Sequence, residues 1–323
     1  SNRAADMTPN SYPVELSALD ITPYRRSNTG IDFVTTLDSG APGPHVMLSA
    51  LVHGNELCGA HALDYLVREE VRPERGKLTL AFMNVAAYAR FDPANPAASR
   101  HVDEDFNRVW SAEVLDGPRD SVELRRAREV RHLMDTVDLL LDIHSMHHTN
   151  PPLMLAGPLD KGRRLALDVG APTLVVCDAG HTAGTRMRDY ARFSNPESAG
   201  NALLVECGQH WTRGTEEVAI DVALRFLACT GVVALDWATE RLPRAAPAVQ
   251  RIIEVSGPVT IESDRFRFVE DYEGMEVIPD EGTIIGWDGE RTVRTPYPEC
   301  VLIMPSRRLR RGESAVRLGR YVG

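Results

Sequence analysis

The sequence predicts an α/β protein in which helices pack on a sheet, followed by a smaller β-rich domain. The chain has 323 residues, and proteins average about 150 residues per domain, which suggests two domains. Apolar, strand-like runs alternate with stretches of helical period through most of the chain, a pattern that favours a sheet covered by helices. After the segment LPRAAP (242–247), short β-like runs separated by Gly, Pro and Asp replace the helical patterns. We therefore expect one domain over residues 1–244 and a β-rich domain over 245–323.

The first predicted elements are a strand, a helix, a second strand and a second helix. The run HVMLSALV (45–52) is apolar almost throughout, as in a strand buried on both faces. Residues 58–71 carry apolar side chains at helical spacing, 77–85 form another apolar run, and 121–136 have an amphipathic helical pattern. Between them, residues 86–120 are polar, contain proline and lack periodicity. Loops of more than about 12–15 residues are usually functional or disordered, so this one is a candidate functional loop.

Three later apolar runs complete the predicted sheet. They cover residues 137–145, 171–178 and 201–208, and each is short and uninterrupted enough for an interior strand. A helix is expected over 214–231, where a glycine ends the periodic stretch.

Composition excludes several classes of partner. With 36 basic and 46 acidic residues the net charge is −10, which disfavours binding to nucleic acid or to an anionic membrane surface. No apolar run approaches the ~18 residues of a membrane span. The five cysteines form no C-x-x-C pair, and the N-terminal residues lack a basic start followed by an apolar stretch, so we expect a cytoplasmic protein. Nothing in the sequence selects between a monomer and a homo-oligomer.

Polar residues with metal-binding chemistry follow two of the predicted strands. The strand at 45–52 leads directly into His53 and Glu56, and the strand at 137–145 ends near His144. If these strands are parallel, the three side chains meet at one edge of the sheet, where open α/β sheets bind ligands. Two histidines and one glutamate are the ligand set of a catalytic zinc site that leaves a fourth position for water. Asp142 is expected either to support His144 or to make a structural hydrogen bond.

Further candidates come from the strand at 201–208 and from the long loop. Glu206 places a carboxylate at the same edge, where it can accept a proton from a water molecule that zinc has made acidic. Arg100 and the cluster that ends in Arg108 are suited to holding a carboxylate or a developing oxyanion. The alternative for Arg108 is a loop ion pair with Asp103 or Asp105. A small anionic amide or ester substrate is therefore expected.

Four motifs in this order resemble the aspartoacylase and succinylglutamate desuccinylase family. They are HGNE (53–56), R-x-x-x-x-D-x-N-R (100–108), DIHS (142–145) and VECG (205–208), and together they are far more specific than any one of them. The resemblance implies a zinc-carboxypeptidase-like mixed sheet flanked by helices, a smaller C-terminal all-β domain, and hydrolysis of a small N-acyl amino acid at one Zn²⁺ per chain.

The same resemblance implies a role for each matching residue. His53, Glu56 and His144 match the zinc ligands, and Glu206 matches the catalytic glutamate that serves as general base. Arg100 matches the arginine that polarises the scissile carbonyl, while Asn107 and Arg108 match the pair that holds the substrate's α-carboxylate. Family members that cleave N-acetylaspartate hold its second carboxylate with an arginine upstream of the catalytic glutamate and a tyrosine of the C-terminal domain. Candidates for these two positions are Arg186, Arg188, Arg192 and Tyr272.

Two other functions remain open at this point. A metallocarboxypeptidase on the same fold would cut short peptides that have a free carboxyl end. A non-catalytic sensor or scaffold would bind zinc without hydrolysis, although a full set of ligands, base and oxyanion group is unnecessary for binding alone. The acyl group and the amino acid of the substrate are not determined by the sequence.

Overall fold

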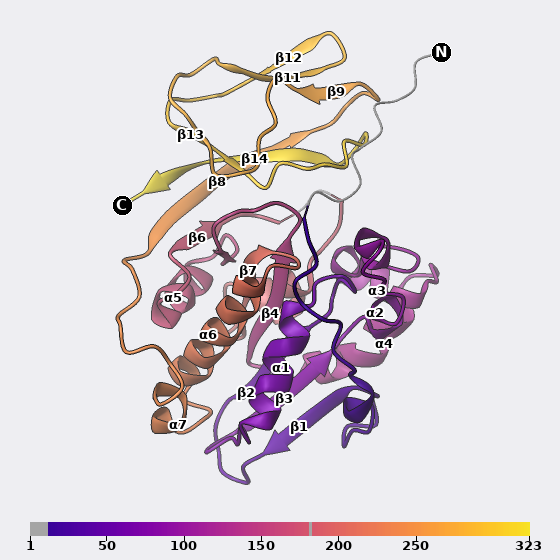
Figure 1. Ribbon diagram of the computed structural model, residues 1–323, viewed down its shortest axis with the longest axis vertical. Coiled ribbons are helices and arrows are strands. Elements are labelled where there is room, and N and C mark those ends of the chain that lie inside the picture. Colours follow the sequence, from indigo (N-terminus) through magenta and orange to yellow (C-terminus); the bar gives the residue numbers. More distant parts are fainter. Residues whose placement is uncertain (1–11, 181–182) are drawn as a thin grey trace.

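The computed structural model describes residues 12–180 and 183–323. These residues form a large mixed sheet, helices on both of its faces, and a smaller antiparallel sheet at one end (Figure 1). The predicted fold class is confirmed. The first eleven residues, which include most of the N-terminal stretch without a leader pattern, lie outside the described residues.

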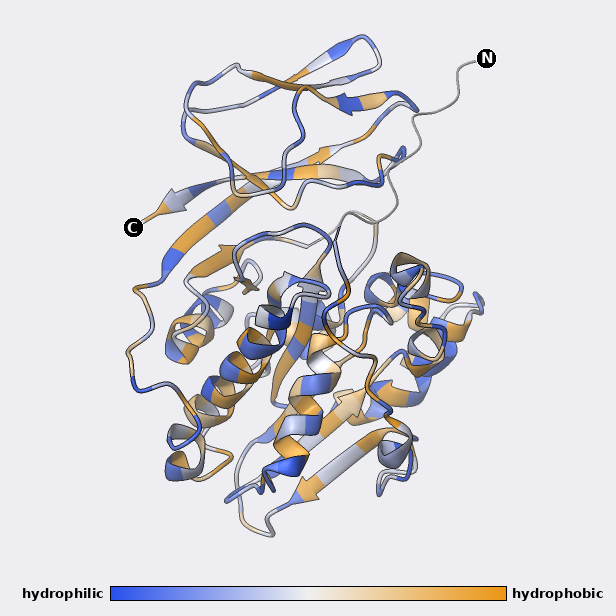
Figure 2. Cartoon of the chain, viewed as in Figure 1, coloured by the Kyte–Doolittle hydropathy of each residue, from blue (hydrophilic) through white to orange (hydrophobic). Residues whose placement is uncertain are grey.

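The middle of the large sheet consists of parallel strands. β2 (His45–Ala50) lies between β3 (Lys77–Phe82) and β4 (Leu139–Met146), and β4 is followed by β7 (Asn201–Gln209). All three of these pairs are parallel, so the condition on which the predicted site depends is met. Their side chains are buried almost throughout, as expected for strands covered on both faces. In Figure 2 these strands are largely orange, whereas the helices around them alternate between orange and blue.

Other strands extend the sheet on both sides. β1 (Val34–Asp38) pairs antiparallel with β3 at one edge, and β5 (Leu153–Leu155) pairs antiparallel with β7. β6 (Leu174–Cys177) then pairs parallel with β5. The short β1 and β5 were not predicted, because runs of three to five residues give too weak a periodic signal.

Helices cover both faces of this sheet. One face is covered by α1 (Cys58–Arg68), α5 (Asp160–Val169), α6 (Arg213–Thr230) and α7 (Leu235–Thr239). The opposite face carries α3 (Ala112–Asp116) and α4 (Val122–Met134). The short α2 (Val85–Tyr88) instead packs Val85 and Tyr88 against the core of the first face. The side chain of Ser121 accepts a hydrogen bond from Leu124 N and so begins α4. Gly231, with φ of 72°, ends α6 where only a left-handed residue fits. α5 was not predicted, because half of its ten residues are charged.

The long loop between β3 and α4 is built from short turns. It contains α2, two 3₁₀ turns, η2 (Pro96–Ser99) and η3 (Phe106–Arg108), and α3. Single 3₁₀ turns also occur at η1 (Thr22–Tyr24), η4 (Met187–Asp189) and η5 (Ala191–Ser194).

The C-terminal part of the described chain contains strands only. β8 (Arg251–Thr260) pairs parallel with β6 and antiparallel with β14 (Ser314–Val322), and the large sheet ends with β13 (Cys300–Ile303) and β10 (Val277–Ile278). The smaller sheet consists of β9 (Phe266–Phe268), β11 (Ile284–Asp288) and β12 (Arg291–Arg294). Because β8 continues the large sheet, the C-terminal strands share a hydrophobic core with β5, β6 and β7. A domain boundary at residue 245 stays a prediction.

The described part of the chain has no helix that is both long and apolar enough to cross a membrane.

Candidate active site

The predicted metal ligands lie at the carboxyl ends of neighbouring parallel strands. His53 and Glu56 occupy the turn between β2 and α1, and His144 lies in β4. The ligand atoms of these three residues all lie within 4.8 Å of one another, and no other such group of His, Cys, Asp or Glu occurs in the described residues. All three side chains are buried. The structure therefore brings together the three ligands that the sequence predicts.

The two histidines present the same ring nitrogen to the shared carboxylate. His53 Nδ1 lies 2.7 Å from Glu56 Oε2, and His144 Nδ1 lies 3.1 Å from Glu56 Oε1. The backbone N–H of Ser145 donates a third hydrogen bond to Glu56, at 2.8 Å. Although burial alone would raise it, the two histidines hold the pKa of Glu56 well below its usual range.

The remaining nitrogen of each ring is held by a second carboxylate. His53 Nε2 lies 2.7 Å from Asp105 Oδ1, and His144 Nε2 lies 2.6 Å from Asp142 Oδ2. Asp142 is itself oriented by the hydroxyl of Ser49, which donates to it at 2.7 Å. A carboxylate on Nε2 keeps the ring proton there and leaves the Nδ1 lone pair for a metal ion, the usual arrangement of metal-binding histidines. Asp142 thus contacts His144, as one of its two predicted roles requires.

The chemistry of this donor set fits a divalent metal ion. Two imidazole nitrogens and one carboxylate converge, both rings are oriented through their far nitrogens, and the centre is buried. His53, Glu56 and His144 are the residues that would hold the ion, and their composition is that of a three-ligand catalytic zinc site.

Glu206 lies beside this group on the neighbouring strand. Glu206, in β7, is the register partner of His144 in the adjacent strand β4. Its side chain is buried, and Oε2 has no hydrogen-bond partner among the described residues. Burial raises the pKa of Glu206 to about 8; Glu56 acts in the same direction, while the charges of His144 and Arg100 oppose the rise. A carboxyl group that titrates near neutral pH and keeps a free oxygen is suited to accepting and donating a proton.

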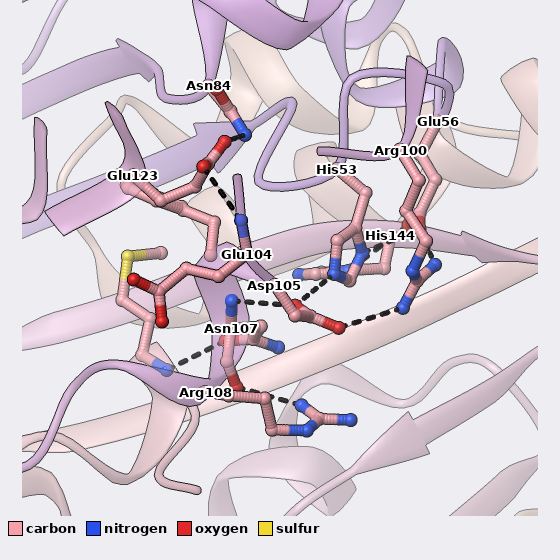
Figure 3. Close-up of polar contacts among 12 residues, drawn as sticks. His53, Glu56, Asn84, Arg100, Glu104, Asp105, Asn107, Arg108, Glu123 and His144 are labelled. Atoms are coloured by element: carbon pink, nitrogen blue, oxygen red, sulfur yellow. Dashed lines mark hydrogen bonds and ion pairs between the residues drawn. The ribbon is translucent and has the colours of Figure 1, made fainter. Parts of the chain in front are cut away.

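Arg100 reaches the centre from the long loop. Its guanidinium donates to Glu56 Oε2 and to Asp105 Oδ2, each at 3.3 Å (Figure 3). Its backbone carbonyl accepts a hydrogen bond from Gly54 N at 3.0 Å. These contacts hold a permanent positive charge beside the candidate ligands, where it can stabilise an oxyanion.

Asn107 and Arg108 lie in η3, next to Asp105. The side-chain oxygen of Asn107 accepts a hydrogen bond from Met187 N at 2.8 Å, which leaves its amide NH₂ as the donor for other groups. Arg108 donates to the backbone carbonyl of Asn107 at 2.8 Å, and no carboxylate of the described residues forms an ion pair with it. The alternative of a loop ion pair for Arg108 is therefore not what this structure contains. Burial and the neighbouring arginines lower the pKa of Arg108 to about 10.

The loop that carries these residues is held by a carboxylate which the sequence did not single out. Glu123, in the first turn of α4, is fully buried. It accepts hydrogen bonds from the backbone N–H groups of Val102, Asp103 and Glu104 at 2.8–3.1 Å, and from the amide of Asn84 at 2.8 Å. Figure 3 shows Glu123 and Asn84 beside the loop. In the sequence, a glutamate in the first turn of a helix is explained by its favourable interaction with the helix dipole. Its hydrogen bonds to a loop about 20 residues away could therefore not be predicted from the sequence.

The candidates for a second carboxylate-binding position lie in different surroundings. Arg186 and Arg188 are buried and form ion pairs with Asp178 and Asp189. Arg192 donates to the carbonyl of Val137. Tyr272 lines a cavity of about 420 Å³ among the C-terminal strands and His148.

The fold and the site together define the class of protein. Residues 42–228 match the succinylglutamate desuccinylase/aspartoacylase catalytic domain. This match covers more than half of the chain, which therefore belongs to that family. No curated protein sequence matches the chain significantly.

Solved structures share the same fold at low sequence identity. Succinylglutamate desuccinylase from Vibrio cholerae superposes with a TM-score of 0.67 at 18% identity, covering 88% of this chain and 84% of that one. The product-bound ectoine utilization protein from Ruegeria pomeroyi gives 0.59 at 17% identity, covering 92% of each chain. Murine aminoacylase 3 gives 0.59 at 18% identity, covering 87% of this chain and 96% of that one. These likenesses extend over the C-terminal strands as well as the catalytic domain.

Proposed function

We propose that this protein is a zinc-dependent amidohydrolase that removes the acyl group from a small N-acyl amino acid. The observation that carries the proposal is the His53–Glu56–His144 group with Glu206 beside it, within a chain that belongs to a family named for such hydrolases. One ion per chain is proposed, because the described residues contain one such group. A cytoplasmic location is proposed from the five cysteines, all of which are free thiols.

Each residue of the site has a part in the proposed reaction. A divalent metal ion held by the three ligands would lower the pKa of a water molecule and polarise the acyl carbonyl. Ionised Glu206 accepts the proton of the attacking water and returns it to the nitrogen of the leaving amine. Arg100 stabilises the charge that develops on the carbonyl oxygen. Asn107 and Arg108 bind the substrate's α-carboxylate and so orient the amide bond.

The first test is release of free amine from a panel of N-acyl amino acids and short peptides by the zinc-loaded protein, with and without chelator. Release from N-acyl amino acids that chelator abolishes is the expected result. Release only from peptides with a free carboxyl end would replace the proposal by a metallocarboxypeptidase. If no compound releases amine, both hydrolase functions are contradicted, and a non-catalytic zinc-binding sensor or scaffold is the alternative that is left.

The second test separates the roles of the ligands and of the base. Glu206→Gln keeps the shape of the side chain but cannot accept a proton. We expect it to retain zinc and to lose roughly 100- to 10,000-fold in kcat, the usual contribution of a general base. An active Glu206→Gln protein would remove Glu206 from the mechanism.

A further inference from the structure

The end of strand β7 contacts both segments that carry the proposed metal ligands. His144 of β4 is the register partner of Glu206 in β7, and the next register pair is Met146 with Gln209. Between these two pairs β4 has one residue, Ser145, whereas β7 has two, so the ladder contains a β-bulge. Ser145 directly follows a proposed ligand but has no register partner among the described residues of β7.

His210, the first residue after β7, holds the chain at this bulge through two hydrogen bonds. Its backbone N–H donates to the carbonyl of Met146 at 2.8 Å, and its Nδ1 lies 2.7 Å from the hydroxyl oxygen of Ser145. Both side chains are buried. Burial lowers the pKa of His210 to about 3, so at neutral pH the ring is uncharged and one of its nitrogens can accept the hydroxyl proton of Ser145. The side chain of His210 therefore fixes the position of Ser145.

Ser145 is in turn connected to two of the proposed ligands. Its backbone N–H donates at 2.8 Å to Oε1 of Glu56, the same oxygen that lies 3.1 Å from Nδ1 of His144. The peptide bond joins Ser145 directly to His144. A shift of Ser145 would therefore displace the carboxylate and the imidazole together, and the hydrogen bond from His210 acts on both ligands through this one residue.

Trp211, the next residue along the chain, holds the segment that precedes Glu56. Its indole N–H donates at 3.0 Å to the backbone carbonyl of Asn55. Trp211 is fully buried, and its backbone N–H donates to the side chain of Gln209 at 2.9 Å. The carbonyl of Gln209 accepts a hydrogen bond from the hydroxyl of Thr215 in α6 at 2.6 Å. The turn that carries His210 and Trp211 is thus itself attached to a long helix.

We propose that His210 and Trp211 are positioning residues of the metal centre, which hold Glu56 through Ser145 and through Asn55. The inference rests on the metal-dependent function proposed above. Within the described residues, neither side chain forms a hydrogen bond to a proposed ligand, so each acts through an intermediate residue. One continuous segment, 206–211, then carries the general base and fixes the carboxylate ligand beside it.

The first readout is zinc affinity, measured by competition with a chromophoric chelator. His210→Leu removes the hydrogen bond to Ser145, and Trp211→Phe removes the indole N–H while keeping an aromatic ring. We expect each variant to bind zinc about 10-fold or more weakly, the usual effect of removing a group that orients metal ligands. His210→Asn, whose side-chain amide can take the place of Nδ1, should recover most of the lost affinity.

Two further readouts separate a positioning role from a general loss of stability. Co²⁺ accepts the same kinds of ligand as zinc, and its visible absorption spectrum reports how they are arranged around the ion. We expect the bands of the Co²⁺-saturated His210→Leu and Trp211→Phe variants to differ from those of the wild type. Ser145→Ala removes the same hydrogen bond as His210→Leu, so the double variant should bind zinc no more weakly than the weaker of the two single variants.

The matched controls lose equivalent hydrogen bonds away from the site. Nε2 of His45, at the amino end of β2, lies 2.6 Å from the hydroxyl oxygen of Thr79. The indole N–H of Trp237 donates to the carbonyl of Glu69 at 3.2 Å. His45→Leu and Trp237→Phe should keep the zinc affinity and the Co²⁺ spectrum of the wild type, even where they lower Tm.

Other outcomes overturn the inference in distinguishable ways. Unchanged zinc affinity and Co²⁺ spectra in folded His210→Leu and Trp211→Phe proteins would contradict it, as would equal losses in the matched controls. Additive losses for Ser145→Ala and His210→Leu would show that His210 does not act through Ser145. If His210→Leu does not fold, the milder Ser145→Ala and Trp211→Phe variants decide.

The metal readouts also distinguish this inference from the proposed reaction. A wild type that binds zinc but releases no amine would contradict the deacylase, and weaker zinc binding by the variants would still support the positioning role. A wild type that binds neither zinc nor Co²⁺ would overturn the zinc site and the positioning role together.

Discussion

Asp105 Oδ1 lies 2.7 Å from Nε2 of His53, so the long loop is attached directly to a proposed metal ligand. Asp105 also accepts hydrogen bonds from Arg100 and from the backbone N–H of Asn107. One carboxylate thereby sets the orientation of the first histidine and the positions of Arg100 and Asn107. Asp142 does the corresponding work for His144, but from within the same strand.

Asp105→Asn is expected to weaken zinc binding by about 10- to 100-fold, the usual effect of removing a carboxylate from a metal-bound histidine. The amide cannot keep the ring proton of His53 on Nε2 as a carboxylate does. Competition with a chromophoric chelator measures the affinity. Asp120→Asn is the control, because Asp120 is exposed and pairs only with Arg125. Equal zinc affinity in both variants would show that Asp105 does not orient the ligand.

Zinc should stabilise the fold through His144. An ion at 100 times its Kd adds about 2.7 kcal/mol to the free energy of unfolding, so chelator should lower Tm and added zinc should restore it. His144→Ala should lose this response. His61→Ala should keep it, since His61 contacts the carbonyl of Ser17 instead of the ligands. A zinc-dependent rise in Tm that survives His144→Ala would place the ion elsewhere.

The raised pKa of Glu206 predicts that the stability of the metal-free protein depends on pH. Burial raises its pKa to about 8, whereas an unfolded glutamate titrates near 4.3. Between these two pH values the folded state keeps a proton on Glu206 that the unfolded state has lost. The contribution of this proton to the free energy of unfolding is therefore complete below about pH 4.3 and is lost as pH rises through about 8.

This contribution can be isolated by difference. The free energy of unfolding is measured in denaturant at several pH values between 4 and 9, with chelator, for the wild type and for Glu206→Gln. We expect the advantage of the wild type over the variant to decrease with rising pH across this window. Parallel pH profiles for the two proteins would mean that the pKa of Glu206 is not raised by folding.

Glu123 should contribute to stability through the loop that it holds. Its removal leaves several backbone N–H groups without an acceptor, so Glu123→Ala is expected to lower the free energy of unfolding by about 2–4 kcal/mol and to reduce turnover by displacing Arg100 and Asp105. Burial alone would raise the pKa of Glu123, but the N–H groups hold it below its usual value. The stabilisation is therefore present above about pH 4.3 and is lost as pH falls through the lower, folded-state pKa.

Chemical denaturation at pH 7 and at pH 3 measures this effect. Glu129→Gln on the same helix is the control, because that carboxylate is exposed and pairs with Arg126. A Glu123→Ala protein as stable and active as the control would show that the loop is held by other contacts.

Local patterns predicted most of the central sheet. The strands that end at His53, His144 and Glu206 are continuous apolar runs, and polar residues at their carboxyl ends stand out against them. Because these strands are parallel and adjacent, their carboxyl ends meet. This arrangement brings the three predicted ligands and Glu206 together. The elements that were not predicted, β1, β5, α2, α3, α5 and α7, are short or highly charged, and long-range packing determines them.

By itself, the sequence determined where the buried strands run and which ionisable residues follow them. A strand buried on both faces is a continuous apolar run, and the polar residues at its end come directly after that run. Only the tertiary structure decided how the segments between those strands are used. Asp105 contacts a histidine 52 positions away, Glu123 holds a loop through its backbone, and Arg317 reaches Asp178 across 139 positions. Such contacts depend on the paths of loops in space, and no local spacing of residue types encodes those paths.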